Sequence, residues 1–132
     1  MTLRKDLNKT LVSCQFSQVE GLIEAVFVTL EDCKFFHGHF PDNPLMPAVL
    51  QMEWARILLD RTGFGSLQCL QIKKAKFHQP ILPGEKVDFK MEIKKNKNIL
   101  EAKCLLGKGN QKVSRFTLLF KVNAKENINE KE

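Results

Sequence analysis

The stretch FFHGHFPDNPLMPAVLQMEW, residues 35–54, decides how this chain is interpreted. It places His39 in a segment punctuated by three prolines, Pro41, Pro44 and Pro47. Each proline fixes its own φ and pushes the preceding residue toward extended geometry, so the segment has little conformational freedom left to lose. A stiff loop of this kind holds a histidine in one place, and the apolar helix expected after it carries one carboxylate, Glu53. The combination is typical of an active site.

A helix is predicted from Pro47 to Thr62, because proline suits the first turn of a helix and Gly63 is a natural stop. Glu53 is out of place on this helix, because an isolated charge in an apolar setting is costly unless it is paired, hydrogen-bonded or shifted in pKa. We expect either a raised pKa for Glu53 or an ion pair with Arg56, three residues on. The apolar residues cover nearly the whole circumference and predict burial on most sides; they are Ala48, Val49, Leu50, Met52, Trp54, Ala55, Ile57, Leu58 and Leu59.

Composition predicts one globular domain. The chain has 132 residues, 43% hydrophobic and 27% charged, so it is long enough to bury a core but too short for two domains. We expect the domain to span residues 1–123, with a polar, disordered tail at 124–132. The N-terminus MTLRKDLNKT has no apolar run after its basic residues, and no segment approaches the ~18 apolar residues of a membrane span. The expected location is the cytoplasm.

The cysteines and histidines give no metal-site pattern. Cysteines are scattered without C-x-x-C spacing, which argues against zinc and disulfides and favours reduced thiols in the core; they are Cys14, Cys33, Cys69 and Cys104. His37 and His39 form an H-x-H pair, but no third ligand is obvious. We therefore expect neither a metal nor a cofactor. His78 is expected on a sheet surface.

The formal net charge of +6 favours an acidic partner. Two lysine clusters lie in the interior of the sequence, namely Lys73, Lys74 and Lys76, then Lys94, Lys95 and Lys97. Neither cluster has a recognition-helix signature or interleaved aromatic residues, so nucleic acid is not favoured. Each cluster is either a solvated strand face or part of a surface for an acidic protein.

Six strands are predicted around the helix. Runs rich in Val, Ile, Phe and Thr at 10–17 and 22–30 form a hairpin, with a turn at Glu20 and Gly21. Four further runs, separated by turns rich in Pro, Gly and Asn, lie at 68–78, 86–94, 99–107 and 112–122. In one of them apolar and charged residues alternate, which gives a dry face and a wet face. We therefore predict an α+β fold in which an antiparallel sheet wraps the long helix.

The segment HFPDNPLMPAVLQMEWA, 39–55, resembles the signature of the 3-hydroxyacyl-(acyl carrier protein) dehydratases of fatty acid synthesis, in which HFP-x-x-P-x-x-PGVL precedes a helix bearing Glu or Asp. The later run KKAKFHQPILPGEKV, 73–87, is similar to the basic strand and PGD turn of that family. The resemblance implies a hotdog fold and protomers that pair to share active sites. With Trp54 after the acid and a short N-terminus, the chain looks more like the dehydratases of polyene-type lipid pathways.

The resemblance also implies a role for each matching residue. His39 matches the catalytic histidine and Glu53 the catalytic carboxylate, which in that family come from different subunits. Ala48 takes the position whose backbone N–H binds the thioester carbonyl. The adjoining substrate-binding positions are Phe40, Pro47 and Val49.

Removal of water from a 3-hydroxyacyl thioester suits these residue types. A histidine with an ordinary pKa near ~6.5 can take the proton from C2 at neutral pH. A helix N-terminus carries about half a positive charge, which favours the thioester oxygen. A glutamate raised in pKa can protonate the departing hydroxyl.

The resemblance implies an acyl carrier protein as partner, whose acidic surface would suit Arg56, Arg61, Lys73, Lys74 and Lys76. The expected assembly is a homodimer, a trimer of dimers or a heterodimer with a paralogue. One departure from the signature is Ala48 in place of the usual glycine, because its Cβ would be strained at a positive φ.

Two other functions stay open. The first is a hotdog thioesterase, which would use a carboxylate and water on the same thioester. The second is a non-catalytic carrier-protein-binding subunit of a heteromeric dehydratase. Release of a free acid would indicate the thioesterase, and binding without turnover would indicate the subunit.

Overall fold

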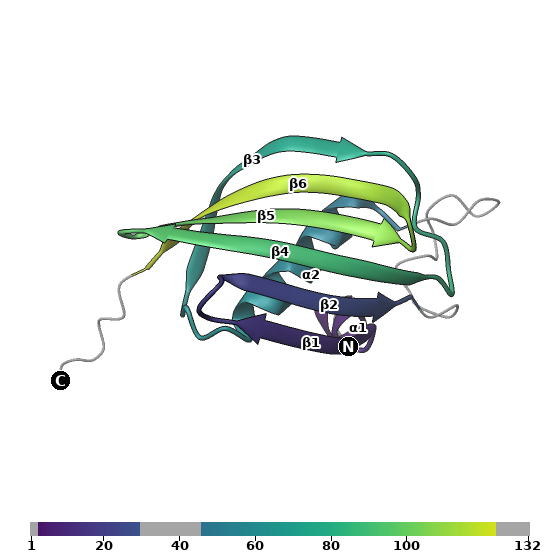
Figure 1. Cartoon of the computed structure of the whole chain (residues 1–132), viewed down its shortest axis with the longest axis horizontal. Coiled ribbons are helices and arrows are strands. Elements are labelled where there is room, and N and C mark those ends of the chain that lie inside the picture. The colour runs from purple at the N-terminus through teal and green to yellow at the C-terminus, as the bar shows by residue number, and fades with distance from the viewer. Residues whose placement is uncertain (1–2, 30–45, 124–132) are drawn as a thin grey trace.

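The computed structural model describes residues 3–29 and 46–123, which form two helices and one six-stranded sheet (Figure 1). In chain order the elements are α1 (Leu3–Asn8), β1 (Leu11–Ser17), β2 (Leu22–Val28), α2 (Ala48–Asp60), β3 (Leu67–Phe77), β4 (Lys86–Asn96), β5 (Ile99–Lys108) and β6 (Gln111–Val122). The predicted long helix and six strands are confirmed, with ends that differ by at most two residues. The expected tail at 124–132 lies outside the described residues.

The first helix, α1, was missed by the sequence analysis, which expected a single helix. It has six residues, too few to show an apolar period. Tertiary contacts stabilise it, because Leu7 is fully buried and Thr10, just after the helix, accepts a hydrogen bond from Trp54 Nε1 on α2 at 2.9 Å.

The sheet has the strand order β1-β2-β4-β5-β6-β3, and every neighbouring pair is antiparallel. After α2 the chain returns to the far side of β6, so β3 is an edge strand although it lies in the middle of the sequence. Figure 1 shows β3 at one edge, β1 at the other, and α2 lying across one face. The predicted antiparallel sheet wrapped on a helix is confirmed.

The core lies between α2 and the inner face of the sheet. On β4, buried Val87, Phe89 and Met91 alternate with exposed charged residues, as the sequence predicted. Trp54, from α2, stacks on Phe27 with ring centroids 4.3 Å apart and is fully buried. The bulky residue after Glu53 is therefore a core residue.

One stripe of α2 is less buried than predicted. The helix begins at Ala48 after Pro47, which has φ −60° and ψ 146°, and it presents seven buried residues to the sheet. The opposite stripe is half-buried or exposed; it contains Val49, Met52, Glu53, Arg56 and Asp60. The expectation of burial on most sides is wrong for this stripe, because the sheet covers one side of the helix.

The cysteines occupy three different environments. Cys104 is buried, and burial raises the pKa of its thiol well above the ordinary value. Cys14 is half-buried, and burial raises its pKa although Arg61 acts in the opposite sense. Cys69 is exposed on the edge strand β3, so the prediction of a core thiol is wrong there, and Cys33 lies outside the described residues.

Neither helix in the described part of the chain is long and apolar enough to cross a membrane.

Candidate active site

A shallow pocket of about 230 Å³ lies where the N-terminus of α2 meets the C-terminal end of β3. It is lined by Met46, Ala48, Gln51, Phe77, His78, Gln79 and Pro80. The first N–H groups of a helix have no partner within the helix and carry a partial positive charge. The pocket therefore contains a surface suited to an electron-rich oxygen, and Ala48 is one of its lining residues.

Ala48 fits this place without backbone strain. Outside glycine, the described residues with positive φ are Lys74 and Lys97, so Ala48 has an ordinary negative φ. The negative φ means that the Cβ causes no backbone strain, and relative to glycine the Cβ narrows the pocket by one methyl group.

Gln51 adds a polar side chain to this pocket that the sequence analysis missed. It is 2% exposed, and its Oε1 accepts a hydrogen bond from Ser114 Oγ, on β6, at 2.6 Å. The available signal was its position on the helix, because Gln51 precedes buried Trp54, Ala55 and Leu58 by three, four and seven residues. A polar residue on that face requires a partner.

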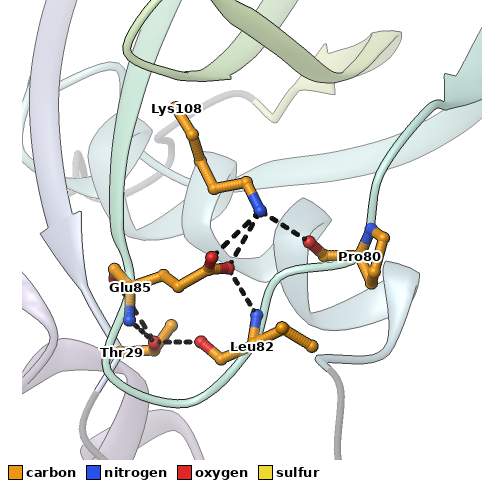
Figure 2. Close-up of polar contacts among 5 residues, drawn as sticks. All are labelled: Thr29, Pro80, Leu82, Glu85 and Lys108. Carbon is orange, nitrogen blue, oxygen red and sulfur yellow. Dashed lines mark hydrogen bonds and ion pairs between the residues drawn. The ribbon is translucent and has the colours of Figure 1, made fainter.

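The turn after the pocket is held by an ion pair. The Glu85 carboxylate accepts hydrogen bonds from Lys108 Nζ at 3.0 and 3.1 Å and from the Leu82 N–H at 2.8 Å (Figure 2). Lys108 also donates to the carbonyl of Pro80 at 3.1 Å. Residues 80–85, which we name the anchor segment, are thus fastened to the end of β5.

The anchor segment binds both ends of the segment that contains His39. On the N-terminal side, Thr29 Oγ1 donates to the Leu82 carbonyl at 2.7 Å and accepts from the Glu85 N–H at 2.9 Å (Figure 2). On the C-terminal side, the Met46 N–H donates to the Ile81 carbonyl at 2.8 Å. Thr29 and Met46, the described residues on either side of positions 30–45, are therefore both bound to one short turn.

The other predicted site residues are separated within one chain. His39 and Phe40 lie outside the described residues. Glu53 is half-buried on α2 and does not line the pocket that Ala48 lines. Helical geometry places it roughly 7.5 Å along the axis from Ala48 and about 140° around it. Pro47 is half-buried, and the Val49 side chain is 62% exposed.

The five predicted carrier-binding residues lie on α2, at its C-terminal end and on β3. Arg56 donates to the Leu67 carbonyl at 3.1 Å and lies 5.5 Å from the centre of the Phe120 ring. Arg61 follows the C-terminal end of α2, and Lys73 pairs with Glu101 at 3.4 Å. Lys74 and Lys76 are exposed on β3.

A different group of basic residues gathers on the outer face of the sheet around a pocket of about 250 Å³. We name this group the outer basic patch; it consists of Lys74, Lys90, Lys103 and Arg115. Each residue comes from a different strand, so the patch could be found in sequence only with the strand order known.

A model of the ApeI-like family, described as ApeI dehydratase, matches residues 15–116. The chain belongs to the ApeI-like dehydratase family. The matched range contains His39, Ala48 and Glu53. The predicted membership of the 3-hydroxyacyl-(acyl carrier protein) dehydratases and their lipid-pathway variants is confirmed.

Curated relatives of this ApeI-like chain are named as dehydratases. It is 36% identical over 113 residues to the 3-hydroxyacyl-(acyl carrier protein) dehydratase FabZ of Pediococcus pentosaceus, covering 80% of this chain and 75% of the relative. It is also 36% identical over 77 residues to FabZ of Sinorhizobium fredii, covering 52% of this chain and 50% of the relative. The matched part thus spans about half the length of some relatives.

Solved structures confirm the hotdog fold. A chain of the dehydratase heterocomplex ApeI:P from Xenorhabdus doucetiae matches with a TM-score of 0.70 and 21% identity, over 84% of this chain and 96% of that one. The fluoroacetyl-CoA-specific thioesterase FlK matches with a TM-score of 0.62 and 12% identity, over 81% and 88%. At these identities the likeness shows the fold alone.

Proposed function

We propose that this protein removes water from 3-hydroxyacyl thioesters carried on acyl carrier protein and forms trans-2-enoyl thioesters. The observation that carries the proposal is the family match over 15–116, which contains His39, Ala48 and Glu53 in the order and spacing of the dehydratase signature. The pocket at the N-terminus of α2 supports it, because the thioester group needs a site for its oxygen.

In the proposed mechanism, His39 accepts the C2 proton and the electron pair of that C–H bond forms the C2–C3 double bond. Glu53 donates a proton to the C3 hydroxyl, and the C3–O bond breaks to release water. Proton transfer by a positioned side chain contributes about 10²–10⁴-fold in rate. The Ala48 N–H stabilises the enolate-like oxygen, a contribution of roughly 10²–10³-fold for one donor.

A second hotdog protomer is proposed to pair with the β3 edge. Among the described strands β3 has a neighbour on one side, and it exposes Leu70, Ile72 and Phe77 by 49%, 48% and 42%. Open strand edges with apolar side chains are templates for pairing with another chain. The ApeI:P relative is named as a heterocomplex, so the partner is a second copy of this chain or a paralogue.

Sedimentation tests this pairing. Ile72→Lys places a charge in the edge strand and should convert the wild-type assembly to monomers, because edge lysines block strand addition. The matched control is Val19→Lys in the β1–β2 turn, which is 98% exposed and should leave the assembly intact. An assembly unchanged by Ile72→Lys would rule out the β3 interface.

We further propose that the acidic carrier protein binds beside β3. The β3–β6 register pairs Lys76 with Arg115, and the next pair joins Phe77 to Ser114, the partner of Gln51. The basic residues of one strand pair and the pocket-side residues of the next pair are therefore adjacent along β3 and β6.

Arg115→Glu tests this docking site. It should raise KM for carrier-bound substrate and leave turnover of a small N-acetylcysteamine thioester unchanged. An equal effect on both substrates would contradict the docking site.

Mass spectrometry of 3-hydroxyacyl chains on acyl carrier protein tests the reaction itself. Wild-type protein should remove one water from the chain, and His39→Ala and Glu53→Gln should abolish the change. Mixing the two variants should restore part of the activity if each site draws on two subunits. Release of free acid would establish a thioesterase, and an unchanged chain at every length would establish a binding subunit.

A further inference from the structure

The side-chain amide of Gln51 is buried, and only its oxygen is hydrogen-bonded within the described part of the chain. The Oε1 atom accepts the Ser114 hydroxyl hydrogen at 2.6 Å, and both residues are 2% exposed. The Nε2 group carries two hydrogens that can donate. No partner for them occurs among residues 3–29 and 46–123. Buried polar groups are nearly always hydrogen-bonded, so this amide requires an acceptor that the described residues do not supply.

The direction of the side chain indicates where that acceptor lies. In a helix each Cα–Cβ bond tilts toward the N-terminus, and a long side chain covers the turn before its own Cα. Gln51 is three residues after Ala48, so its amide reaches back over the first turn of α2. Both residues line the same pocket of about 230 Å³.

We propose that Gln51 is a second donor to the thioester oxygen, beside the Ala48 N–H. This inference rests on the proposed dehydratase function and names the group that holds the substrate in place. Ser114 fixes the amide by its oxygen, so the NH₂ end remains to donate, and Gln51 lines the pocket that would hold the thioester. As the C2 proton leaves, negative charge grows on the thioester oxygen, and a pre-positioned donor stabilises it.

The size of the pocket limits what binds there. At about 30 Å³ for each water-sized group, 230 Å³ holds roughly seven or eight such groups. This is room for the thioester and the first carbons of the chain, including C2 and C3, while a longer acyl chain must extend beyond it. Phe77 and Met46 supply apolar walls for those first carbons.

Variants of Gln51 separate a substrate contact from a role in folding. Gln51→Leu should lower kcat by about 10- to 100-fold, since hydrogen bonds to charged groups are worth this much, with KM changed less than about threefold. Gln51→Glu, which keeps the acceptor for Ser114 but replaces the donor, should lower kcat at least as far. The double variant Gln51→Leu/Ser114→Ala should be as stable as the wild type or more so, because both polar partners are replaced by apolar groups.

Thr10→Val is the matched control. It removes the buried hydrogen bond from Trp54 Nε1, on α2, to Thr10 Oγ1 at 2.9 Å and the one from Thr10 Oγ1 to the Leu7 carbonyl, and none of these residues lines the pocket. It should lower the Tm and leave kcat unchanged. If Gln51→Leu behaves like this control, with a lower Tm and normal kcat, the residue is structural and the inference is overturned.

NMR of the ¹⁵N-labelled side-chain amides gives a readout independent of turnover. A 3-hydroxybutyryl N-acetylcysteamine thioester should shift the Gln51 NH₂ resonance, identified by its loss in Gln51→Leu. A shifted resonance without dehydration would overturn the proposed reaction and support Gln51 as a thioester donor. Dehydration with an unmoved resonance and normal kcat in Gln51→Leu would overturn the inference alone, and neither shift nor dehydration would overturn both.

Discussion

The anchor segment, residues 80–85, gives a quantitative prediction for Thr29→Val. The change keeps the shape of a fully buried side chain and removes its hydroxyl, which donates to the Leu82 carbonyl at 2.7 Å and accepts from the Glu85 N–H at 2.9 Å. The backbone hydrogen bonds of Thr29 to Glu85 and Gly84 remain, so the strand end stays in place.

The expected loss of stability follows from these two hydrogen bonds. At roughly 0.5–1.5 kcal/mol each, they contribute about 1–3 kcal/mol, and the buried methyl group of valine offsets up to ~0.8 kcal/mol. A net loss of about 1.2 kcal/mol is expected from the middle of this range. An unfolding entropy of about 2.1 cal/mol/K per residue over 132 residues then gives a fall in Tm of roughly 4 °C.

Activity should fall further than stability explains. Thr29 and Met46 hold the two ends of the segment with His39, and a displacement of ~1 Å at a catalytic group costs on the order of 10²-fold in rate. Circular dichroism melting and turnover of 3-hydroxyacyl thioesters well below the Tm measure the two effects. Ile93→Val, at the other end of the sheet, is the control with an expected loss of about 0.5–1.5 kcal/mol and normal turnover. Normal turnover in Thr29→Val would refute the idea that the anchor segment positions His39.

Three further predictions concern the framework. Gly21→Ala should destabilise the fold more than Gly109→Ala, because both have φ near +60° but only at Gly21 would the new Cβ lie 2.6 Å from a carbonyl oxygen; urea denaturation gives the difference. Trp54→Phe keeps the ring stacking but loses the indole hydrogen bond, and calorimetry should show a loss of about 1 kcal/mol. Burial keeps the Cys104 thiol neutral in the folded state, so the unfolded state gains thiolate above pH 9.0 and stability falls there by up to about 1.4 kcal/mol per pH unit, a decline that should be weaker in Cys104→Ala.

The fold was largely predictable because its signals are local. Proline and glycine mark the ends of α2, and alternation along β4 gives its buried face directly. The position of β3 beyond β6 was not predictable in this way, because it depends on a pairing between strands far apart in the chain. The burial of α2 was also overestimated, because the number of apolar residues in a helix does not reveal that the sheet covers only one of its sides.

In the candidate site, too, the features with a local sequence signal were predictable and the long-range contacts were not. His39, Ala48 and Glu53 were assigned through the resemblance of residues 39–55 to the dehydratase signature, and the range of the family match contains all three positions. The contact between Gln51 and Ser114 joins residues 63 positions apart, and no short sequence motif predicts it. The outer basic patch likewise requires the register of four strands. The sequence therefore indicates the proposed reaction, whereas the Gln51–Ser114 contact and the outer basic patch can be found only with the structure.

The anchor segment also has an evolutionary consequence. Because the chain is tied down at Thr29 and at Met46 on one turn, the closure of the intervening residues is already established by the scaffold. The entropy of such closure grows slowly, by about 0.6 kcal/mol for each doubling of length. We therefore expect insertions between Thr29 and Met46 that leave His39 and Phe40 in place to cost the fold little stability, so this stretch of sequence can lengthen during evolution without changes in the sheet.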